Sequence, residues 1–209
     1  MTVRGVLFLL LGVILCGPAT AGQLSVTVKD AKGALVNDAV VTVQPEAGSA
    51  GRRVSFPWPY VMSQQDVQFH PFLLIVPVGT EVKFPNNDKV RHHVYSFSPA
   101  KRFQLKLYGR DASRTVVFDK VGTVALGCNI HDRMIAFIDV VDTPWAAKTV
   151  DGSGVLTDLP IGPAVMTVWH PFMLGKPLRM SVVIPARGTA AEAVTVELHP
   201  PAKLSRMQM

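Results

Sequence analysis

Cysteine is the residue that this sequence has least of, with two among 209 residues. One of them, Cys16, lies in a segment that combines a single cation at Arg4, an apolar stretch and a small-residue ending at residues 19–21. This layout predicts a cleavable secretory signal over residues 1–21. Cys128 is then alone in the mature chain, which excludes an internal disulfide. A lone thiol in an oxidising compartment needs protection, either by burial or by a metal.

Long apolar runs are also lacking. Beyond the leader, no stretch approaches the roughly 20 apolar residues that a membrane-spanning helix needs. We therefore expect a protein of the periplasm or a secreted protein, with no transmembrane segment after signal removal. Two alternatives for the N-terminus stay open, an uncleaved anchor and a lipid attached at Cys16. Leu15 speaks against the lipid, because a lipid-attachment signal normally has a small residue there.

Charge of one sign is not strongly in excess. The chain carries 21 Lys and Arg against 15 Asp and Glu, a net charge of +6, and loss of Arg4 with the leader lowers it by one. The cations are scattered and form no basic stripe interleaved with aromatic residues, which argues against a nucleic-acid partner. A weakly cationic surface suits an anionic protein or an anionic membrane face.

A sustained helical period is missing from the mature chain. Instead, short runs of β-branched, aromatic and aliphatic residues recur between Gly, Pro, Asn and Asp, which predicts an all-β sandwich or a pair of them. The expected strands are 24–28, 39–43, 72–76, 81–84, 92–97, 103–108, 115–118, 123–127, 135–141, 165–169, 179–184 and 193–198. Tyr95, Phe97 and Phe103 alternate as core residues would.

Two segments look like domain boundaries. Residues 45–59 are rich in Gly, Pro and Ser, and residues 142–145 end an apolar strand with a proline. We expect a central domain at 62–143, a second, small β-sandwich built from 22–60 and 144–200, and a surface tail at 201–209. The flanking segments resemble transthyretin-like, carboxypeptidase-regulatory sandwiches in their opening hairpin and in an Asp-Leu-Pro-x-Gly turn. A single extended sandwich is the alternative.

The residues with the clearest chemistry lie between two expected strands, as Cys128-x2-His131-x2-Met134. A thiolate, an imidazole and a thioether are soft to borderline ligands that suit copper, and a trigonal His2Cys site with a long axial Met is a blue-copper centre. Closed zinc sites use Cys and His without Met. A Cys/His nucleophile would need oxyanion donors and an orienting acid, and neither accompanies this pair.

The site needs a second histidine, and His92 and His93 are the candidates. Strand alternation sends the two rings to opposite faces, so one of them points at the metal. Phe84, Asn86 and His92 resemble the upstream Phe-x-Asn and His-Asn pattern of the cupredoxin family, which includes plastocyanin, azurin and amicyanin. His93 departs from that pattern by occupying the Asn position.

The cupredoxin resemblance implies a Greek-key β-sandwich and one type 1 copper with the ligands His92, Cys128, His131 and Met134. It implies supporting roles outside the ligand set for His93 and Asn86. The motifs together are similar to exported proteins described as methylamine utilization proteins. The implied function is one-electron transfer, without enzymatic activity, between redox partners such as a periplasmic dehydrogenase or a cytochrome. Copper storage or delivery, and a non-redox binding module, are the alternatives.

Overall fold

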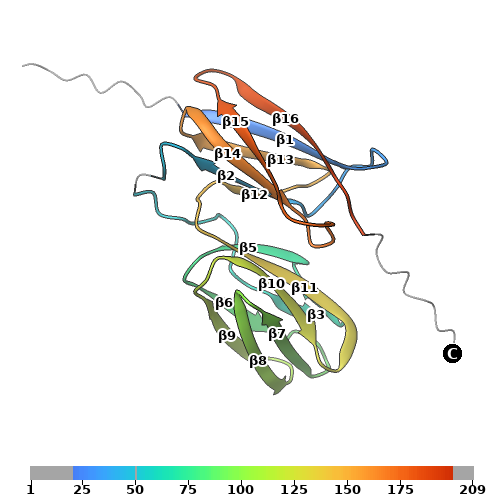
Figure 1. Ribbon diagram of the computed structural model, residues 1–209. Helices are drawn as coiled ribbons and strands as arrows, with labels where there is room; N and C mark the ends of the chain where they lie inside the picture. Colours follow the sequence, from blue (N-terminus) through green and yellow to red (C-terminus); the bar gives the residue numbers. More distant parts are fainter. Residues whose placement is uncertain (1–20, 50, 200–209) are drawn as a thin grey trace, which may run out of the picture.

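The structure is a computed structural model that describes residues 21–49 and 51–199, so the predicted tail and all but the last residue of the predicted signal lie outside it. The described residues form sixteen strands and no helix, which confirms the all-β class. Across the same residues, no helix has the length and hydropathy needed to cross a membrane. The strands group into an upper and a lower module (Figure 1).

The upper module consists of the first two strands and the last five. They are β1 (Gly22–Asp30), β2 (Val40–Pro45), β12 (Ala146–Lys148), β13 (Ser153–Leu159), β14 (Gly162–Trp169), β15 (Leu178–Ile184) and β16 (Thr189–Val196). They form two sheets, β13-β1-β16 and β12-β2-β14-β15. In β1, Leu24, Val26 and Val28 are buried, while the residues between them are partly exposed. This period of two gives the strand one apolar face, and the core of the sandwich forms between such faces.

The lower module consists of the nine strands between them. They are β3 (Ser63–Gln65), β4 (Gln68–His70), β5 (Leu73–Pro77), β6 (Thr80–Pro85), β7 (His92–Ser98), β8 (Lys101–Tyr108), β9 (Ser113–Phe118), β10 (Gly122–Cys128) and β11 (His131–Val141). A five-stranded sheet has the order β5-β11-β10-β7-β8, and β6 pairs with β9. Phe84, Phe118 and Ile138 belong to the buried core of this module. The domain limits 22–60, 62–143 and 144–200 stay predictions.

A separate apolar cluster joins the two modules. Val40 from the upper module packs with Leu73, Ile75 and Val141 from the lower one. The indole of Trp58 packs against this cluster and donates a hydrogen bond of 2.9 Å to the Ile75 carbonyl. His131 begins β11, whose last residue, Val141, belongs to this junction cluster, so the metal-ligand candidates lie at the other end of that strand.

The register of β7 differs from one expectation. Its inward residues are His92, Val94 and Ser96, whereas Phe97 is 64% exposed and Tyr95 is only partly buried. The prediction that Tyr95 and Phe97 belong to the core is therefore wrong. Because alternation fixes a whole strand at once, the inward position of His92 sends both aromatic rings to the opposite face.

Asp139 lies on the outer side of β11, in a hollow near the junction that Trp169 also lines. Burial raises the pKa of its carboxyl to about 6, and a hydrogen bond of 2.9 Å from the Thr123 hydroxyl opposes the shift in part. The folded pKa lies above the unfolded value of about 3.9. The folded state is therefore favoured most below pH 3.9, and this contribution is lost as the pH rises toward 6.

We expect Asp139→Asn to stabilise the protein at pH 8 and to leave its stability almost unchanged at pH 3.5, because the amide carries no charge to bury. The gain at pH 8 should be about 1 to 2 kcal/mol, less than the full shift implies because the carboxyl is partly solvated. Urea unfolding of both proteins at the two pH values measures it. Equal effects at both values, or a loss at pH 8, would contradict this assignment.

Candidate metal centre

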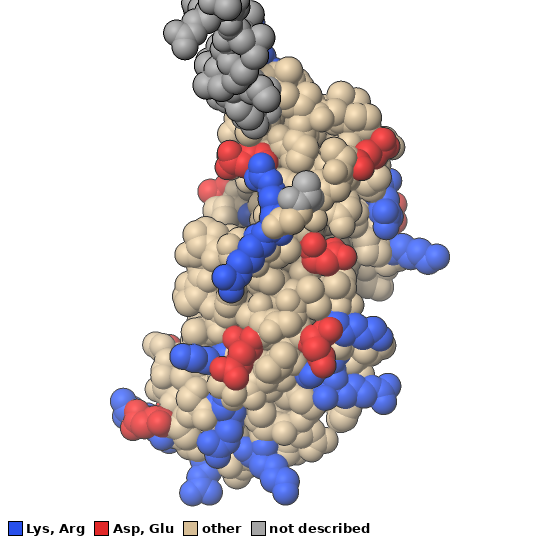
Figure 2. Space-filling view, turned by 90° about the vertical axis from the view of Figure 1, so that its left-hand side faces the viewer, with Lys and Arg blue, Asp and Glu red and all other residues tan. Residues whose placement is uncertain are grey.

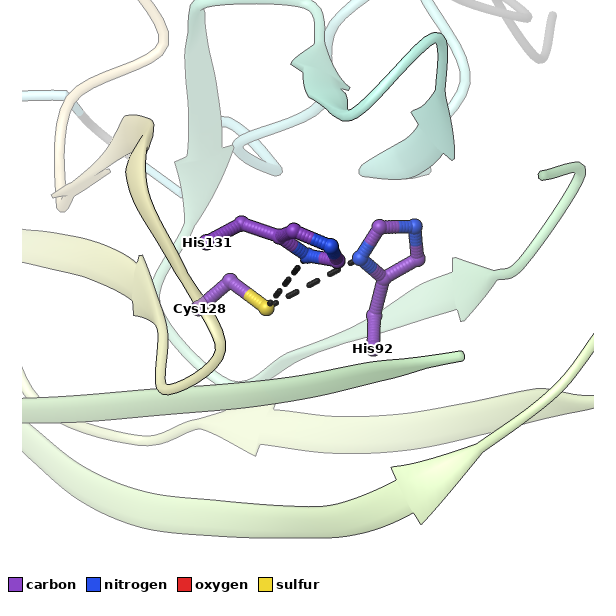
Figure 3. A group of neighbouring side chains, drawn as sticks. All are labelled: His92, Cys128 and His131. Carbon is purple, nitrogen blue, oxygen red and sulfur yellow. Dashed lines mark hydrogen bonds between the residues drawn. The ribbon is translucent and has the colours of Figure 1, made fainter. Parts of the chain in front are cut away.

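Three side chains from three adjacent strands converge at the far end of the lower module. His92 begins β7, Cys128 ends β10 and His131 begins β11, and their ligand atoms all lie within 4.8 Å of one another. Figure 3 shows the Cys128 thiol facing both rings. The Sγ atom lies 3.7 Å from Nδ1 of His92 and 3.5 Å from Nδ1 of His131. Both imidazole rings thus direct their Nδ1 atoms toward the Cys128 sulfur.

Backbone pairing accounts for this convergence. Cys128 is opposite Val94 on β7 and opposite His131 on β11, and the ladder between β10 and β11 shifts its register between Gly127 and Cys128. The turn after Cys128 is tied to β7 by a hydrogen bond of 3.0 Å from the Asn129 N–H to the His93 carbonyl. The thiol and the two rings are therefore held by the main chain of a single sheet.

The distances between the donor atoms fit a metal. Bonds of about 2.0 Å to nitrogen and about 2.3 Å to sulfur, as in zinc sites, separate the two donors by roughly 3.5 to 3.7 Å when the angle at the metal is about 110° to 120°. The two distances from Sγ, 3.5 and 3.7 Å, span this range. The sulfur atom thus lies from both imidazole nitrogens at the distance that a site between tetrahedral and trigonal requires.

Met134 completes the set that the sequence predicts. It follows on β11, is 1% exposed and belongs to the same core cluster as Cys128. His92 is fully buried and Cys128 is 4% exposed, whereas His131 is partly exposed. The four side chains are positioned as in a type 1 copper site, with one imidazole edge open to solvent.

His93 does not point toward the other three. Its side chain lines a surface hollow on the opposite face of β7 together with Tyr95 and Phe97. The residue joins the two ligand-bearing segments through its carbonyl, which accepts the hydrogen bond from Asn129. The main chain of His93, and not its side chain, thus makes this link between the two segments.

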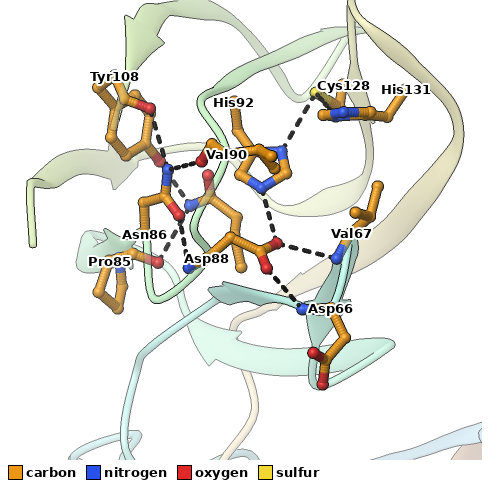
Figure 4. Close-up of polar contacts among 11 residues, drawn as sticks. Asp66, Val67, Pro85, Asn86, Asp88, Val90, His92, Tyr108, Cys128 and His131 are labelled. Carbon is orange, nitrogen blue, oxygen red and sulfur yellow. Dashed lines mark hydrogen bonds and ion pairs between the residues drawn. The ribbon is translucent and has the colours of Figure 1, made fainter. Parts of the chain in front are cut away.

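Asn86, the other residue expected to support the site, holds the turn that leads into β7. Its buried amide group donates hydrogen bonds of 3.0 Å to the carbonyls of Val90 and Tyr108. Its Oδ1 atom accepts a hydrogen bond of 2.8 Å from the Asp88 N–H (Figure 4). The side chain thereby closes residues 86–90 into a compact loop and fixes where Asp88 stands.

Asp88 contacts a ligand candidate directly, although the sequence provides no reason to assign it a role at the site. Its Oδ2 atom lies 2.8 Å from Nε2 of His92. The same carboxylate accepts hydrogen bonds of 3.0 and 2.9 Å from the N–H groups of Asp66 and Val67 (Figure 4). A carboxylate at Nε2 holds the proton there, so Nδ1 keeps its lone pair for a metal.

The hairpin that grips Asp88 has an unusual backbone. Asp66 and Val67 form the two-residue connection between β3 and β4, and both have positive φ, at 54° and 57°. A β-branched residue such as Val67 rarely adopts this conformation. The positive φ angles direct the N–H groups of both residues at one carboxylate. Backbone strain of this kind is often found beside functional sites.

The charge state of Asp88 follows from these contacts. Burial raises the pKa of its carboxyl, but the N–H groups of Val67 and Asp66 and the His92 ring lower it more, so that the pKa lies below its ordinary value. The side chain is therefore ionised at neutral pH. Its negative charge favours a positively charged centre on the other side of the imidazole.

We expect Asp88→Asn to weaken copper binding about 10- to 100-fold, the usual cost of removing the hydrogen-bonding partner of a ligand histidine. Competition with a copper chelator measures the affinity. Asp119→Asn is the matched control, because Asp119 is an exposed carboxylate that pairs with Lys101 and does not contact the site. Equal affinities of the two variants would show that Asp88 has no positioning role.

No family model and no curated protein match the chain. Among solved structures, it is similar to the copper-containing nitrite reductase of Thermus scotoductus, with 26% identity and a TM-score of 0.39 over 44% of this chain and 24% of that one. A purple cupredoxin from Nitrosopumilus maritimus shows 22% identity and a TM-score of 0.35 over 39% and 96% of the two chains. An amicyanin mutant in its reduced state shows 18% identity and a TM-score of 0.37 over 48% and 99%. The chain thus spans about a quarter of the nitrite reductase and is similar to cupredoxins over about half of its own length.

Proposed function

We propose that this protein is an exported type 1 copper protein that carries single electrons between redox partners. One observation supports it above all others: one ligand atom each from His92, Cys128 and His131 lie within 4.8 Å of one another, and the Cys128 Sγ atom lies 3.7 and 3.5 Å from the two Nδ1 atoms. The predicted secretory signal supports a location in the periplasm or outside the cell. A periplasmic dehydrogenase or a cytochrome is the kind of partner we propose.

The donor set favours copper over zinc. Zinc sites closed by protein ligands use four Cys and His residues, whereas this set has one thiolate, two imidazoles and the buried thioether of Met134. When bound, copper supplies a centre that changes by one electron between Cu(I) and Cu(II). His92, Cys128 and His131 would hold the copper, with Met134 as a weaker fourth ligand, and this donor set suits both oxidation states.

The protein contributes rigidity. His92 is held by Asp88 at 2.8 Å, and Asp88 is held in turn by the Asp66–Val67 hairpin and the Asn86 loop. Cys128 is fixed by the sheet on both sides. Donors that are placed before a metal arrives have little to rearrange when its charge changes, which keeps electron transfer fast.

His131 offers a route for the electron. It is the partly exposed member of the set, and Ile130 beside it is 50% exposed. Lys and Arg side chains gather at the lower end of the molecule, on the side that Figure 2 displays. An imidazole edge beside an exposed apolar side chain suits brief contact with a redox partner.

We expect the mature protein to turn intensely coloured when Cu(II) is added, because a thiolate bound to copper gives a strong charge-transfer band in the visible range. Cys128→Ser should remove this band while the protein stays folded by circular dichroism. A reversible one-electron wave in cyclic voltammetry should accompany the coloured form. A wild-type protein that binds Cu(II) without the band would contradict the proposed function.

A second pair of variants tests which histidine binds. We expect His92→Ala to abolish the band, because the fully buried ring supplies one of the three donors. His93→Ala should keep the band, since this ring lines a hollow on the other face of β7. Spectra of both variants at equal copper loading decide the question, and the reverse result would contradict the assignment of His92.

A further inference from the structure

The outer face of β7 carries a row of aromatic side chains that the metal centre does not use. His93, Tyr95 and Phe97 point to this face, and Phe97 is 64% exposed. The rings of Tyr95 and Phe97 lie 5.1 Å apart between centroids. Together with Gln104 and Asn129, the three residues line a shallow surface hollow, called the aromatic hollow below. Exposed rings that cluster in this way are typical of binding surfaces.

The aromatic hollow lies against the chain that holds the thiolate. The Tyr95 ring covers Gly127, where an added Cβ would lie only 2.8 Å from its Cζ and Oη atoms. Gly127 directly precedes Cys128, and Asn129, which follows it, donates its N–H to the His93 carbonyl. One layer of backbone therefore separates a partner seated in the hollow from the Cys128 side chain.

The charged residues that β8 presents on this face are cations. On β8, the exposed Arg102 is opposite Phe97 and Gln104 is opposite Tyr95, with the exposed Lys106 two residues further on. Neither cation takes part in an ion pair among the described residues. The strands β7 and β8 themselves contain no Asp or Glu. An apolar spot edged by free cations is complementary to a surface on which carboxylates surround an apolar contact.

We propose that the outer face of β7 and β8 docks an acidic protein, with Tyr95 and Phe97 as the apolar contact and Arg102 and Lys106 as the paired charges. The use of this surface in electron transfer rests on the proposed function, whereas the docking itself does not need copper. Two cations do not make the continuous basic stripe that a nucleic acid would need. The surface meets the turn between β10 and β11 at Asn129, whereas His131 is not among the residues that line the hollow.

The test uses the chain from residue 22 onward, labelled with 15N, both copper-free and with Cu(I). The probe is ferrous cytochrome c whose lysines have been succinylated, which makes it acidic, and unmodified basic cytochrome c is the comparison. We expect amide shifts confined to β7, β8 and the 127–129 segment with the acidic probe, and none with the basic one. Docking should weaken as salt is raised, because the paired charges are exposed.

Variants locate the surface. Arg102→Glu with Lys106→Glu should weaken binding of the acidic probe about tenfold or more, since both charges then repel it. Lys29→Glu with Lys176→Glu makes the same change in net charge on the upper module and should alter the affinity by less than about twofold. Phe97→Ser removes an exposed ring without touching the core and should also weaken binding.

Three results would overturn the proposal. They are shifts centred on residues 130–134, equal loss of binding in the two double variants, and shifts that follow the concentration of this chain without a probe, which would indicate self-association. Unchanged circular dichroism ensures that each variant is folded. Shifts seen in the copper-free chain support docking even if the coloured copper form never appears, so a failed copper assignment is distinguishable from a failed docking surface.

Discussion

The metal centre depends on one piece of backbone pairing, that between the end of β10 and β7. Gly127 is opposite Tyr95 and Cys128 is opposite Val94, so the thiol side chain comes next to the ring of His92. The hairpin to β11 then returns His131 to the same point. A slip of one residue would turn Cys128 to the outer face, because side chains alternate along a strand. The register of this sheet thus decides whether a site exists.

The hydrogen-bonded loop around Asp88 fixes the orientation of the His92 ring. A buried imidazole with free rotation could present either nitrogen, and the carboxylate at Nε2 selects Nδ1 for the centre. The cost of placing a charge beside a buried ring is offset by three hydrogen bonds to one carboxylate, two of them from N–H groups of a strained hairpin. Residues distant in sequence therefore cooperate to hold one ligand candidate.

The sequence predicts three of the four ligand candidates well, because they lie close together in the chain. Cys128, His131 and Met134 belong to one hairpin, so their spacing alone indicates a site. Alternation along β7 also indicates that His92 and His93 face opposite ways. Alternation does not say which face is inward. The apolar character of Tyr95 and Phe97 led to the wrong prediction that these two side chains face the core. Ser96 is buried in their place because the sheet register, set by strand pairing, places His92 inward.

Asp88 could not be found in the same way. In the sequence it is one polar residue of a predicted turn. The N–H groups that hold it belong to Asp66 and Val67, which lie 22 and 21 positions earlier in the chain. Only the folded chain brings them together. One available signal was its position four residues before His92, which allows a side-chain contact across a tight loop.

X-ray absorption at the copper edge, on the loaded protein in both oxidation states, tests the central claim most directly. We expect one short bond to sulfur and two to imidazole nitrogen, with lengths that change little between Cu(II) and Cu(I), because the sheet and the Asp88 loop hold the donors in place. A first shell without sulfur, or one that changes its ligands between the two states, would contradict it.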